Sequence, residues 1–482
     1  MKAAGRLRIS GALACLLTLA LLAGACGKPD SQSKPSAMES DQIIRPSGGI
    51  LPVTVYAGPD YTGRSAVLEE GDYALSSLPG FESGIIAGVR IPAGSRLLLY
   101  RSGQKGGGFL SLEEDEPDLT GSGWASDLVS VRVGKNLPET DEAVLSYNYV
   151  LGTQAFNPLY GFSGTDRVYE AAKRIWEIGS NVIKLHDKSD YDAILRDFDF
   201  RYVYLWLRTD TTNWRDGLSA TESELEYDAV YEETRRLLRD YDGSGKTFYL
   251  GHWEGDWYLI DNYDANQTLL DPDRVRGMIG WLNIRQQAID DAKRDTPHDN
   301  VQVYGYTEAN RTADIASGAQ RLANTVLPYV NIDYLSYSAY DIQGLSAGQI
   351  KAYLDQMEGA MPPRDVPGPR VFIGETGLPA VLTENREDRH NAVNAAFFRK
   401  YFEAGVPQIL YWQMYNNEQA DGKQQGYWLI DNRNHKWKLY YTFKAFYGNA
   451  REYVRDGIQQ NGAPPGAREF ADWAAAFLET MQ

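Results

Sequence analysis

The sequence predicts a multidomain protein in which an all-β domain precedes a larger α/β domain. Between residues 51 and 134, short β-prone runs alternate with turns that contain Gly, Pro or Asp, which is typical of a sandwich or barrel. From residue 140 to residue 450, eight strand candidates alternate with helical stretches, which indicates βαβ units. Eight such units in about 300 residues match the number and size of a closed (β/α)8, or TIM, barrel.

Residues 1–25 have the pattern of an export signal. Three basic residues precede an apolar run from Ile9 to Leu22, and small residues then lead to Cys26. The run is too short for a membrane span. The segment resembles a bacterial lipoprotein signal, which implies that Cys26 is lipid-modified and anchors the exported protein to the membrane at the bacterial cell surface. Ala23 and Ala25 also suit ordinary signal peptidase, which would release a secreted protein.

The composition of the following tether and of the whole chain restricts the possible partners. Residues 26–50 are rich in Ser, Pro, Lys, Asp and Gly, which is typical of a flexible tether. The net charge of −17 argues against a nucleic-acid partner, because such partners need a basic surface. Aromatic residues make up 12% of the chain. They serve either ordinary packing or stacking on sugar rings, and composition alone does not distinguish the two.

The first domain contains an internal repeat. Its expected strands are Val53–Tyr56, Ser65–Leu68, Gly88–Ile91, Arg96–Tyr100, Phe109–Leu112 and Val129–Val133. The run that ends at Tyr56, followed by Tyr61 and Gly63, recurs as a run that ends at Tyr100, followed by Gly107. Two such copies resemble the double Greek key of a βγ-crystallin domain.

Calcium binding by this domain is not expected. Microbial βγ-crystallin domains often bind calcium through paired Asn or Asp residues, whereas the matching stretches here, Ser83–Gly88 and Ala125–Ser130, lack such a pair. Calcium requires several oxygen ligands. A spacer or accessory role is the simplest interpretation, and an inhibitor or adhesin role is the alternative.

The second domain begins after residue 139. Its expected strands are Val144–Val150, Asn181–Leu185, Tyr202–Leu207, Thr247–Leu250, Val301–Tyr304, Tyr334–Tyr337, Val371–Ile373 and Gln408–Trp412. Its expected helices are Arg167–Ile178, Glu222–Asp240, Pro272–Arg294, Ala319–Val330, Ala347–Gly359 and Arg389–Ala404. An open doubly wound sheet is the alternative, but no Gly-rich nucleotide loop follows the first strand. Residues 451–482 form an extension with a helix and carry no functional signal.

Two glutamates stand where buried strands give way to loops. Glu254 follows the fourth expected strand, and Glu375 follows the seventh. The carboxyl ends of barrel strands meet on one rim, where the chemistry of this fold takes place. Two carboxyl groups that face each other across a sugar are the minimum apparatus for cleaving a glycosidic bond.

This placement resembles the large clan of retaining glycoside hydrolases built on the barrel (clan GH-A). The resemblance implies that Glu254 is the general acid/base and Glu375 the nucleophile. It also implies that Tyr337 or Tyr340, after the sixth strand, steadies the nucleophile. Trp412, at the end of the eighth strand, matches the clan's tryptophan platform for the sugar.

One residue departs from the clan pattern. The clan has asparagine before the acid/base, where it holds the sugar 2-hydroxyl group, and this chain has Trp253. The 2-hydroxyl contact then comes from Asn310, Asn416 or Asn417, or the substrate differs at that carbon. Burial between Trp253 and Trp257 would raise the pKa of Glu254 by desolvation.

Further polar residues near these motifs are candidates for the site. Glu308, after the fifth strand, competes with Glu254 and Glu375 for either role. His252 and Asp256 flank the acid and either bind hydroxyl groups, tune the acid or pack the loop. No metal or other cofactor is expected, because no His, Asp and Glu spacing suggests a metal centre. No Gly-x-Ser-x-Gly motif indicates a serine hydrolase.

The sequence therefore predicts a surface-anchored retaining glycoside hydrolase that acts on an extracellular or cell-wall polysaccharide. One alternative is a barrel that binds glycan without cleaving it. The other assigns the function to the βγ-crystallin-like domain, as an adhesin or inhibitor.

Overall fold

The computed structural model describes residues 50–101, 108–186, 189–209 and 214–482. The expected signal, Cys26 and residues 26–49 of the tether lie outside these ranges. Within them, no helix combines the length and apolar character needed to cross a membrane.

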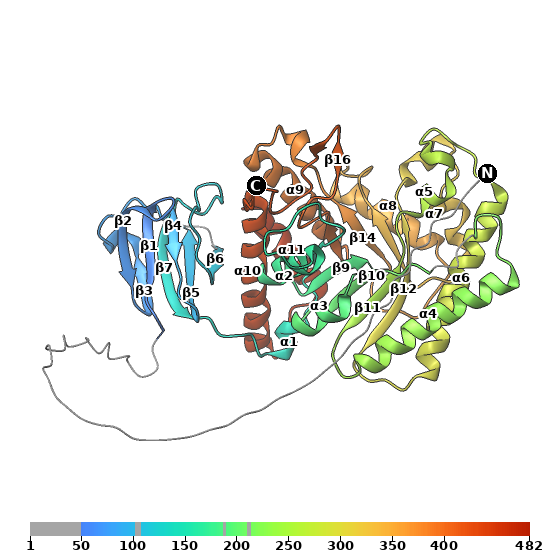
Figure 1. Cartoon of the computed structure of the whole chain (residues 1–482), viewed down its shortest axis with the longest axis horizontal. Helices are drawn as coiled ribbons and strands as arrows, with labels where there is room; N and C mark the ends of the chain where they lie inside the picture. Colours follow the sequence, from blue (N-terminus) through green and yellow to red (C-terminus); the bar gives the residue numbers. More distant parts are fainter. Residues whose placement is uncertain (1–49, 102–107, 187–188, 210–213) are drawn as a thin grey trace, which may run out of the picture. The chain divides into compact units, whose positions relative to one another are not determined.

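The β domain is built from two antiparallel sheets (Figure 1). Its strands are β1 (Val53–Gly58), β2 (Thr62–Leu68), β3 (Gly71–Ala74), β4 (Gly88–Arg90), β5 (Ser95–Arg101), β6 (Phe109–Leu112) and β7 (Leu128–Lys135). One sheet has the order β2-β1-β4 and the other β3-β7-β5-β6. The sequence did not predict β3. This strand belongs to the first repeat but pairs with β7 of the second repeat. This exchange interlocks the two repeats as a double Greek key.

Buried side chains that alternate with more exposed ones along these strands form the core of the β domain. Val53 and Val55 of β1, Leu97 and Leu99 of β5, and Val131 of β7 are almost completely buried. Because successive strand residues point to opposite faces, this period of two places one face of each sheet in the core.

Eight parallel strands close the barrel of the second domain. They are β8 (Leu151–Gln154), β9 (Val182–His186), β10 (Tyr202–Trp206), β11 (Thr247–Gly251), β12 (Gln302–Ala309), β13 (Tyr334–Ser338), β14 (Val371–Thr376) and β15 (Ile409–Tyr411). Each strand pairs in parallel with its neighbour in chain order, and β15 pairs with β8 to close the ring. The prediction of a (β/α)8 barrel is therefore confirmed.

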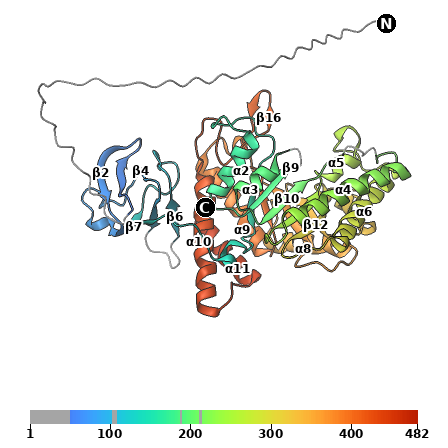
Figure 2. The same cartoon turned by 60° about the horizontal axis from the view of Figure 1, so that its bottom comes forward.

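Helices surround this barrel (Figures 1 and 2). They are α1 (Glu142–Leu145), α2 (Arg167–Glu177), α3 (Tyr191–Asp197), α4 (Ala220–Asp240), α5 (Gly255–Leu259), α6 (Pro272–Asp295), α7 (Leu322–Thr325), α8 (Ala347–Ala360), α9 (Glu387–Glu403), α10 (Lys438–Asn461) and α11 (Ala467–Glu479). Side chains cap two of these helices: the Asp271 side chain accepts from the Asp273 amide before α6, and Ser346 forms a capping box with Gln349 at the start of α8. Helix α10 crosses residue 450, where the sequence placed a domain boundary.

Two expected elements are wrong in position or extent. Residues 144–150 do not form the first strand. Asp141 caps the short helix α1 there, and β8 begins only at Leu151. The expected helix Ala319–Val330 is reduced to α7 and a 3-10 turn over Leu327–Tyr329, which has Pro328 in its first turn. Proline lacks the amide hydrogen that a continuing helix would need.

The β domain contacts the barrel through α10. The Asn449 side chain donates to the Phe109 carbonyl at 2.8 Å and accepts from the Phe109 amide at 3.2 Å. Lys444, which is largely buried, donates to Glu113 at 2.7 Å, and Lys436 donates to Glu116 at 2.9 Å. Charged pairs therefore join the second repeat to the outer surface of the barrel.

Candidate active site

Glu254 lies just beyond the end of β11 and directly before α5. Gly251 ends the strand, and a Cβ atom there would lie 2.3 Å from the ring of Tyr306. Glycine therefore allows the aromatic ring to fill the barrel interior directly beside this strand end. Glu254 is 8% exposed, so its carboxyl group lies in a largely dry environment.

Glu375 occupies an irregular part of β14. The register against β13 shifts so that Tyr337 pairs with Ile373 and Ser338 pairs with Glu375, which skips Gly374. A bulge of this kind changes the direction of a side chain and is common beside active sites. Glu375 is 6% exposed, and its Oε1 accepts a hydrogen bond of 2.9 Å from the Tyr340 hydroxyl. Its Oε2 has no hydrogen-bond partner among the described residues.

The two carboxyl groups affect each other's protonation. Burial, followed by the charge of Glu308, raises the pKa of Glu254 to about 8, and Ser338, Trp257 and Lys184 oppose this rise. Burial, followed by the charges of Glu254 and Glu308, raises the pKa of Glu375, and Lys184 and Tyr340 oppose it. Like charges in a low-dielectric site cannot both ionise freely, so ionisation of one carboxyl group disfavours ionisation of the other.

Glu308 lies on the floor of this site as half of a buried ion pair. Lys184 on β9 donates to Glu308 Oε2 at 2.7 Å and to the Gly374 carbonyl at 3.0 Å, and neither side chain is exposed. Ser336 on β13 also donates to Glu308 Oε2, at 2.6 Å. A buried charge needs such partners. Glu308 is therefore paired with Lys184, and its charge acts on both of the other carboxyl groups.

Sequence reasoning missed Lys184 and Ser336. The signal for Lys184 was present, because a lysine in the middle of the apolar run from residue 181 to residue 185 must either leave the barrel or find a buried partner. Ser336 gave no signal of its own. A Cβ atom at position 374 would lie 1.7 Å from the Ser336 hydroxyl oxygen. The absence of a side chain on Gly374 therefore leaves space for this hydroxyl.

Aromatic rings gather at the ends of β10 and β15. Trp412 follows β15 and lies 6.4 Å from Trp206 and 5.5 Å from Phe156, measured between ring centroids. Its indole donates to Glu418 at 2.9 Å, and its peptide bond to Gln413 is cis. Trp253 packs against the larger apolar cluster of the barrel interior to which these rings belong, and it is partly exposed.

Of the two candidate tyrosines, the structure brings Tyr340 to Glu375. Tyr337 is completely buried, and its hydroxyl donates to Asp341 and accepts from Thr312 at 2.6 Å. Tyr337 therefore supports the loop after β13 rather than contacting the carboxyl pair.

Several other sequence candidates hold the loops around the pair. Asp256 accepts hydrogen bonds from the amides of Asn310 at 2.9 Å, Leu322 at 2.7 Å and Arg311 at 3.3 Å. It thereby joins the loops after β11 and β12. Asn310 is 8% exposed, and its Oδ1 has no hydrogen-bond partner among the described residues.

His252 and Asn416 are also engaged within the protein. The ring nitrogens of His252 lie 2.6 Å from the Trp253 carbonyl and 2.8 Å from the Thr307 hydroxyl. Burial lowers the pKa of His252 to about 3, so the ring is neutral at physiological pH. Asn416 donates to the Glu418 carbonyl at 2.7 Å and accepts from the Tyr427 amide at 3.0 Å, which holds the loop after β15.

Within the described ranges, no group of three or more His, Cys, Asp or Glu side chains is arranged to hold a metal ion.

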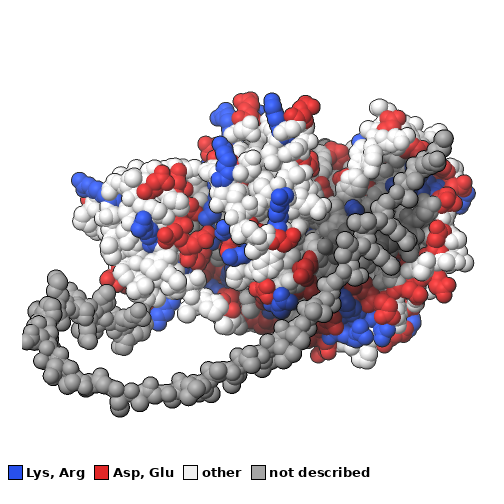
Figure 3. Space-filling model, viewed as in Figure 1, with Lys and Arg blue, Asp and Glu red and all other residues white. Residues whose placement is uncertain are grey.

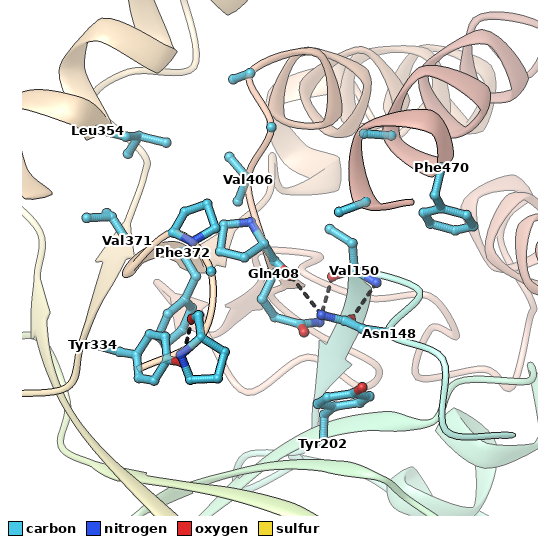
Figure 4. Close-up of a pocket in the computed structure, with 18 of the residues that line it drawn as sticks. Asn148, Val150, Tyr202, Tyr334, Leu354, Val371, Phe372, Val406, Gln408 and Phe470 are labelled. Atoms are coloured by element: carbon cyan, nitrogen blue, oxygen red, sulfur yellow. Dashed lines mark hydrogen bonds between the residues drawn. The ribbon is translucent and has the colours of Figure 1, made fainter. Parts of the chain in front are cut away.

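A cavity of about 750 Å³ opens at the other end of the barrel (Figure 4). It is lined by the first residues of five strands, Tyr202, Thr247, Gln302, Tyr334 and Val371. The carboxyl pair therefore does not lie in this cavity.

Several solved βγ-crystallin domains resemble a part of this chain that has the length of the β domain. A βγ-crystallin domain from Flavobacterium johnsoniae is 31% identical over 18% of this chain and 98% of its own, with a TM-score of 0.17. Hahellin, a beta-gamma crystallin, is 29% identical over 19% of this chain and 100% of its own, with a TM-score of 0.16. A βγ-crystallin domain from Clostridium beijerinckii is 25% identical over 17% of this chain and 95% of its own, with a TM-score of 0.16.

No protein-family model and no curated protein matches the chain. By its strand order, the chain is a multidomain protein in which a double Greek-key β domain precedes a TIM barrel.

Proposed function

We propose that the protein is a retaining glycoside hydrolase that acts on an extracellular or cell-wall polysaccharide. The observation that carries this proposal is the carboxyl pair at the ends of β11 and β14. Glu254 and Glu375 are both buried, burial raises the pKa of each, and the charge of Glu254 also raises the pKa of Glu375. A pair of carboxyl groups that shares one proton supplies the acid and the nucleophile of glycoside cleavage.

In the first step, the Glu375 carboxylate attacks the anomeric carbon and forms a glycosyl ester. The bond between that carbon and the leaving oxygen breaks, and Glu254 transfers its proton to the oxygen. The Tyr340 hydroxyl donates its hydrogen bond to Glu375, which favours the ionised form there and leaves the shared proton on Glu254.

In the second step, Glu254 acts as a base. It has lost its proton and, with Glu375 neutral in the ester, it no longer faces a negative neighbour. It takes a proton from water while the water oxygen attacks the anomeric carbon. The ester bond breaks, Glu375 becomes a carboxylate again, and the sugar keeps its anomeric configuration.

Location supports a polymer as the substrate. The export signal and the tether expected over residues 1–50 would hold the barrel outside the membrane, either anchored through Cys26 or released. Polysaccharides of the envelope or the surroundings are the sugar polymers available there.

The test is release of reducing ends from a panel of polysaccharides. We expect Glu254→Gln to reduce turnover by about 10²–10⁴-fold, because it removes general acid catalysis, and Glu375→Gln to reduce it further. Glu224→Gln, on the exposed surface of α4, is the matched control and should retain full turnover. Full turnover in either active-site variant would overturn the assignment.

A second candidate is a barrel that binds glycan without cleaving it. Trp253 favours this alternative, because it replaces the asparagine that would hold the sugar 2-hydroxyl. Retention of a polysaccharide by the wild-type protein, with no reducing ends released from any member of the panel, would support the binding role.

A further inference from the structure

The segment from residue 253 to residue 263, which contains Glu254, presents aromatic rings at the barrel rim. Tyr263 is 62% exposed, and Trp253 and Trp257 are partly exposed. The Tyr263 ring centroid lies 6.5 Å from that of Trp253 and 6.1 Å from that of Trp257. We call Trp253 and Tyr263, with Trp257 beside them, the aromatic platform.

The surrounding chain holds this platform in place. The guanidinium group of Arg311 lies 5.0 Å from the Trp257 ring centroid, and it also donates to the Ala265 carbonyl at 3.1 Å. Asp261 forms an ion pair of 2.6 Å with Arg274 on α6. Tyr263 itself has a φ of 57°, a left-handed conformation that is costly for a bulky residue. Such strain persists where the surrounding structure fixes it, and it is common at binding sites.

The platform is continuous with the centre of the site. Trp253 packs against the apolar cluster of the barrel interior that contains Trp206 and Trp412, and its ring also lies beside that of Tyr263, so Trp253 links the barrel interior to the platform. Glu254 follows Trp253 directly in the chain. In glycoside cleavage, the acid touches the oxygen between the cleaved sugar and the leaving group. Rings on the acid's own segment therefore flank the leaving group.

We propose that the aromatic platform binds sugar residues on the leaving-group side of the cleaved bond, so that the substrate is cleaved between sugars of a chain. This inference rests on the proposed hydrolase function and specifies its substrate. A sugar ring has an apolar C–H face that stacks on an aromatic ring and hydroxyl groups that remain in water, which matches rings that are half exposed. A glycoside with a small leaving group would leave Tyr263 uncovered.

The platform gives a reason for the presence of Trp253 at the position where the clan has asparagine. An asparagine there would contact the 2-hydroxyl of the sugar being cleaved, whereas Trp253 extends the stacking surface toward Tyr263. Binding energy from sugars remote from the reacting carbon can be used to orient the scissile bond, so truncated substrates lose turnover as well as affinity.

The first experiment compares two substrates of the same sugar: a polysaccharide that the wild-type protein cleaves and the corresponding glycosyl fluoride, whose leaving group is a single atom. Tyr263→Ala should lower kcat/KM for the polymer about tenfold more than for the fluoride. Tyr329→Ala is the matched control, because Tyr329 is 66% exposed and lies in the 3-10 turn that leads into the amino end of β13. Equal losses on both substrates, or no loss on the polymer, would overturn the proposal.

The second experiment measures binding without turnover. Glu375→Gln is run in native gels that contain hydroxyethyl cellulose, xylan, galactomannan, laminarin or glycol chitin. We expect at least one polymer to retard the protein, and Tyr263→Ala in the same background to weaken that retardation at least about fivefold. Retardation that is unchanged by Tyr263→Ala, or no retardation by any polymer, contradicts the platform. Retardation that depends on Tyr263, without cleavage by the wild type, supports the platform and rejects the hydrolase proposal.

Discussion

At the scale of single residues, the proposal depends on where one proton resides. Glu254 and Glu375 are both buried, the charge of Glu254 raises the pKa of Glu375, and the Tyr340 hydroxyl donates a hydrogen bond to Glu375. An asymmetric hydrogen bond to a shared-proton pair selects which carboxyl group is ionised. The residues that surround the pair therefore determine the two roles, not the glutamates alone.

The pH dependence of turnover should report the pKa of Glu254. The acid must be protonated to donate, and its pKa of about 8 keeps it protonated through neutral pH. As the pH rises above about 8, kcat/KM should fall about tenfold per unit, because the protonated fraction falls at that rate. Measured with the best polysaccharide, this alkaline limb should disappear in Glu254→Gln. An unchanged limb in that variant would assign the titration to another group.

The sequence identified the carboxyl pair but not its support. Glu254, Glu375 and Trp412 were found because strand ends and short motifs mark them. Lys184 and Ser336 were missed because their roles depend on partners more than 20 residues away, which only the barrel brings together. Asp256 looked like a site residue because of its position, and its carboxylate is instead engaged by three backbone amides.

At the scale of elements, β9, β12, β13 and β14 form the floor of the site. The Lys184–Glu308 pair crosses the barrel interior from β9 to β12, and Lys184 also holds the carbonyl that precedes Glu375. Gly374 gives Ser336 the space to donate to Glu308. The direction of Glu375 is thus fixed by four strands at once.

Gly374→Ala should disrupt this floor. Its Cβ atom would lie 1.7 Å from Ser336 Oγ and 3.2 Å from Glu308 Oε2, and overpacking of a buried site costs about 1–3 kcal/mol. We expect a lower free energy of unfolding in urea and a large loss of turnover. Gly359→Ala on α8 is the control, because nothing lies within 4 Å of the new methyl group, and it should stabilise the protein by about 0.5–1 kcal/mol. A Gly374→Ala protein with wild-type stability and turnover would contradict the packing described.

Lys184→Met should leave Glu308 as an unpaired buried charge. Loss of one partner of a buried pair costs about 3–5 kcal/mol, and neither side chain here is exposed. The double variant Lys184→Met/Glu308→Gln should recover part of that loss, because no charge is then left unpaired. Urea unfolding of both single variants and the double variant measures the coupling. Strictly additive losses would mean that the two side chains do not interact.

Element boundaries show where sequence patterns are insufficient. The alternation of strands and helices correctly predicted the barrel, because the two periodicities differ clearly over long segments. The first strand was misplaced because the apolar residues before Leu151 belong to α1 and its following loop. Strand β3 was missed because its four residues carry no long apolar run.

At the scale of the whole molecule, the β domain and the barrel are joined through α10. Lys444 is buried by this contact and paired with Glu113. Elsewhere on the surface, Lys and Arg side chains lie among Asp and Glu side chains on the face shown in Figure 3. Part of the acidic excess of the sequence serves the contact between the domains, because Glu116 pairs with Lys436 and Glu113 pairs with Lys444.

Glu113→Ala should weaken this contact and leave the carboxyl pair unaltered. A buried cation without its partner costs about 1–3 kcal/mol, so the free energy of unfolding should fall while turnover persists. Asp72→Asn is the control in the same domain, because its ion pair with Arg132 is exposed and such pairs contribute only about 0–1 kcal/mol. Differential scanning calorimetry of both variants measures the difference. Equal small effects would mean that Lys444 does not depend on Glu113.

The most direct test of the central claim is to identify the residue that carries the sugar during turnover. A set of 2-deoxy-2-fluoroglycosyl fluorides, which form the glycosyl ester faster than they lose it, would be reacted with the protein and the labelled peptide located by mass spectrometry. The account predicts a covalent sugar on Glu375, formed in wild-type protein and absent from Glu375→Gln. A label on Glu308 or Glu254, or polysaccharide cleavage that inverts the anomeric configuration, would contradict it.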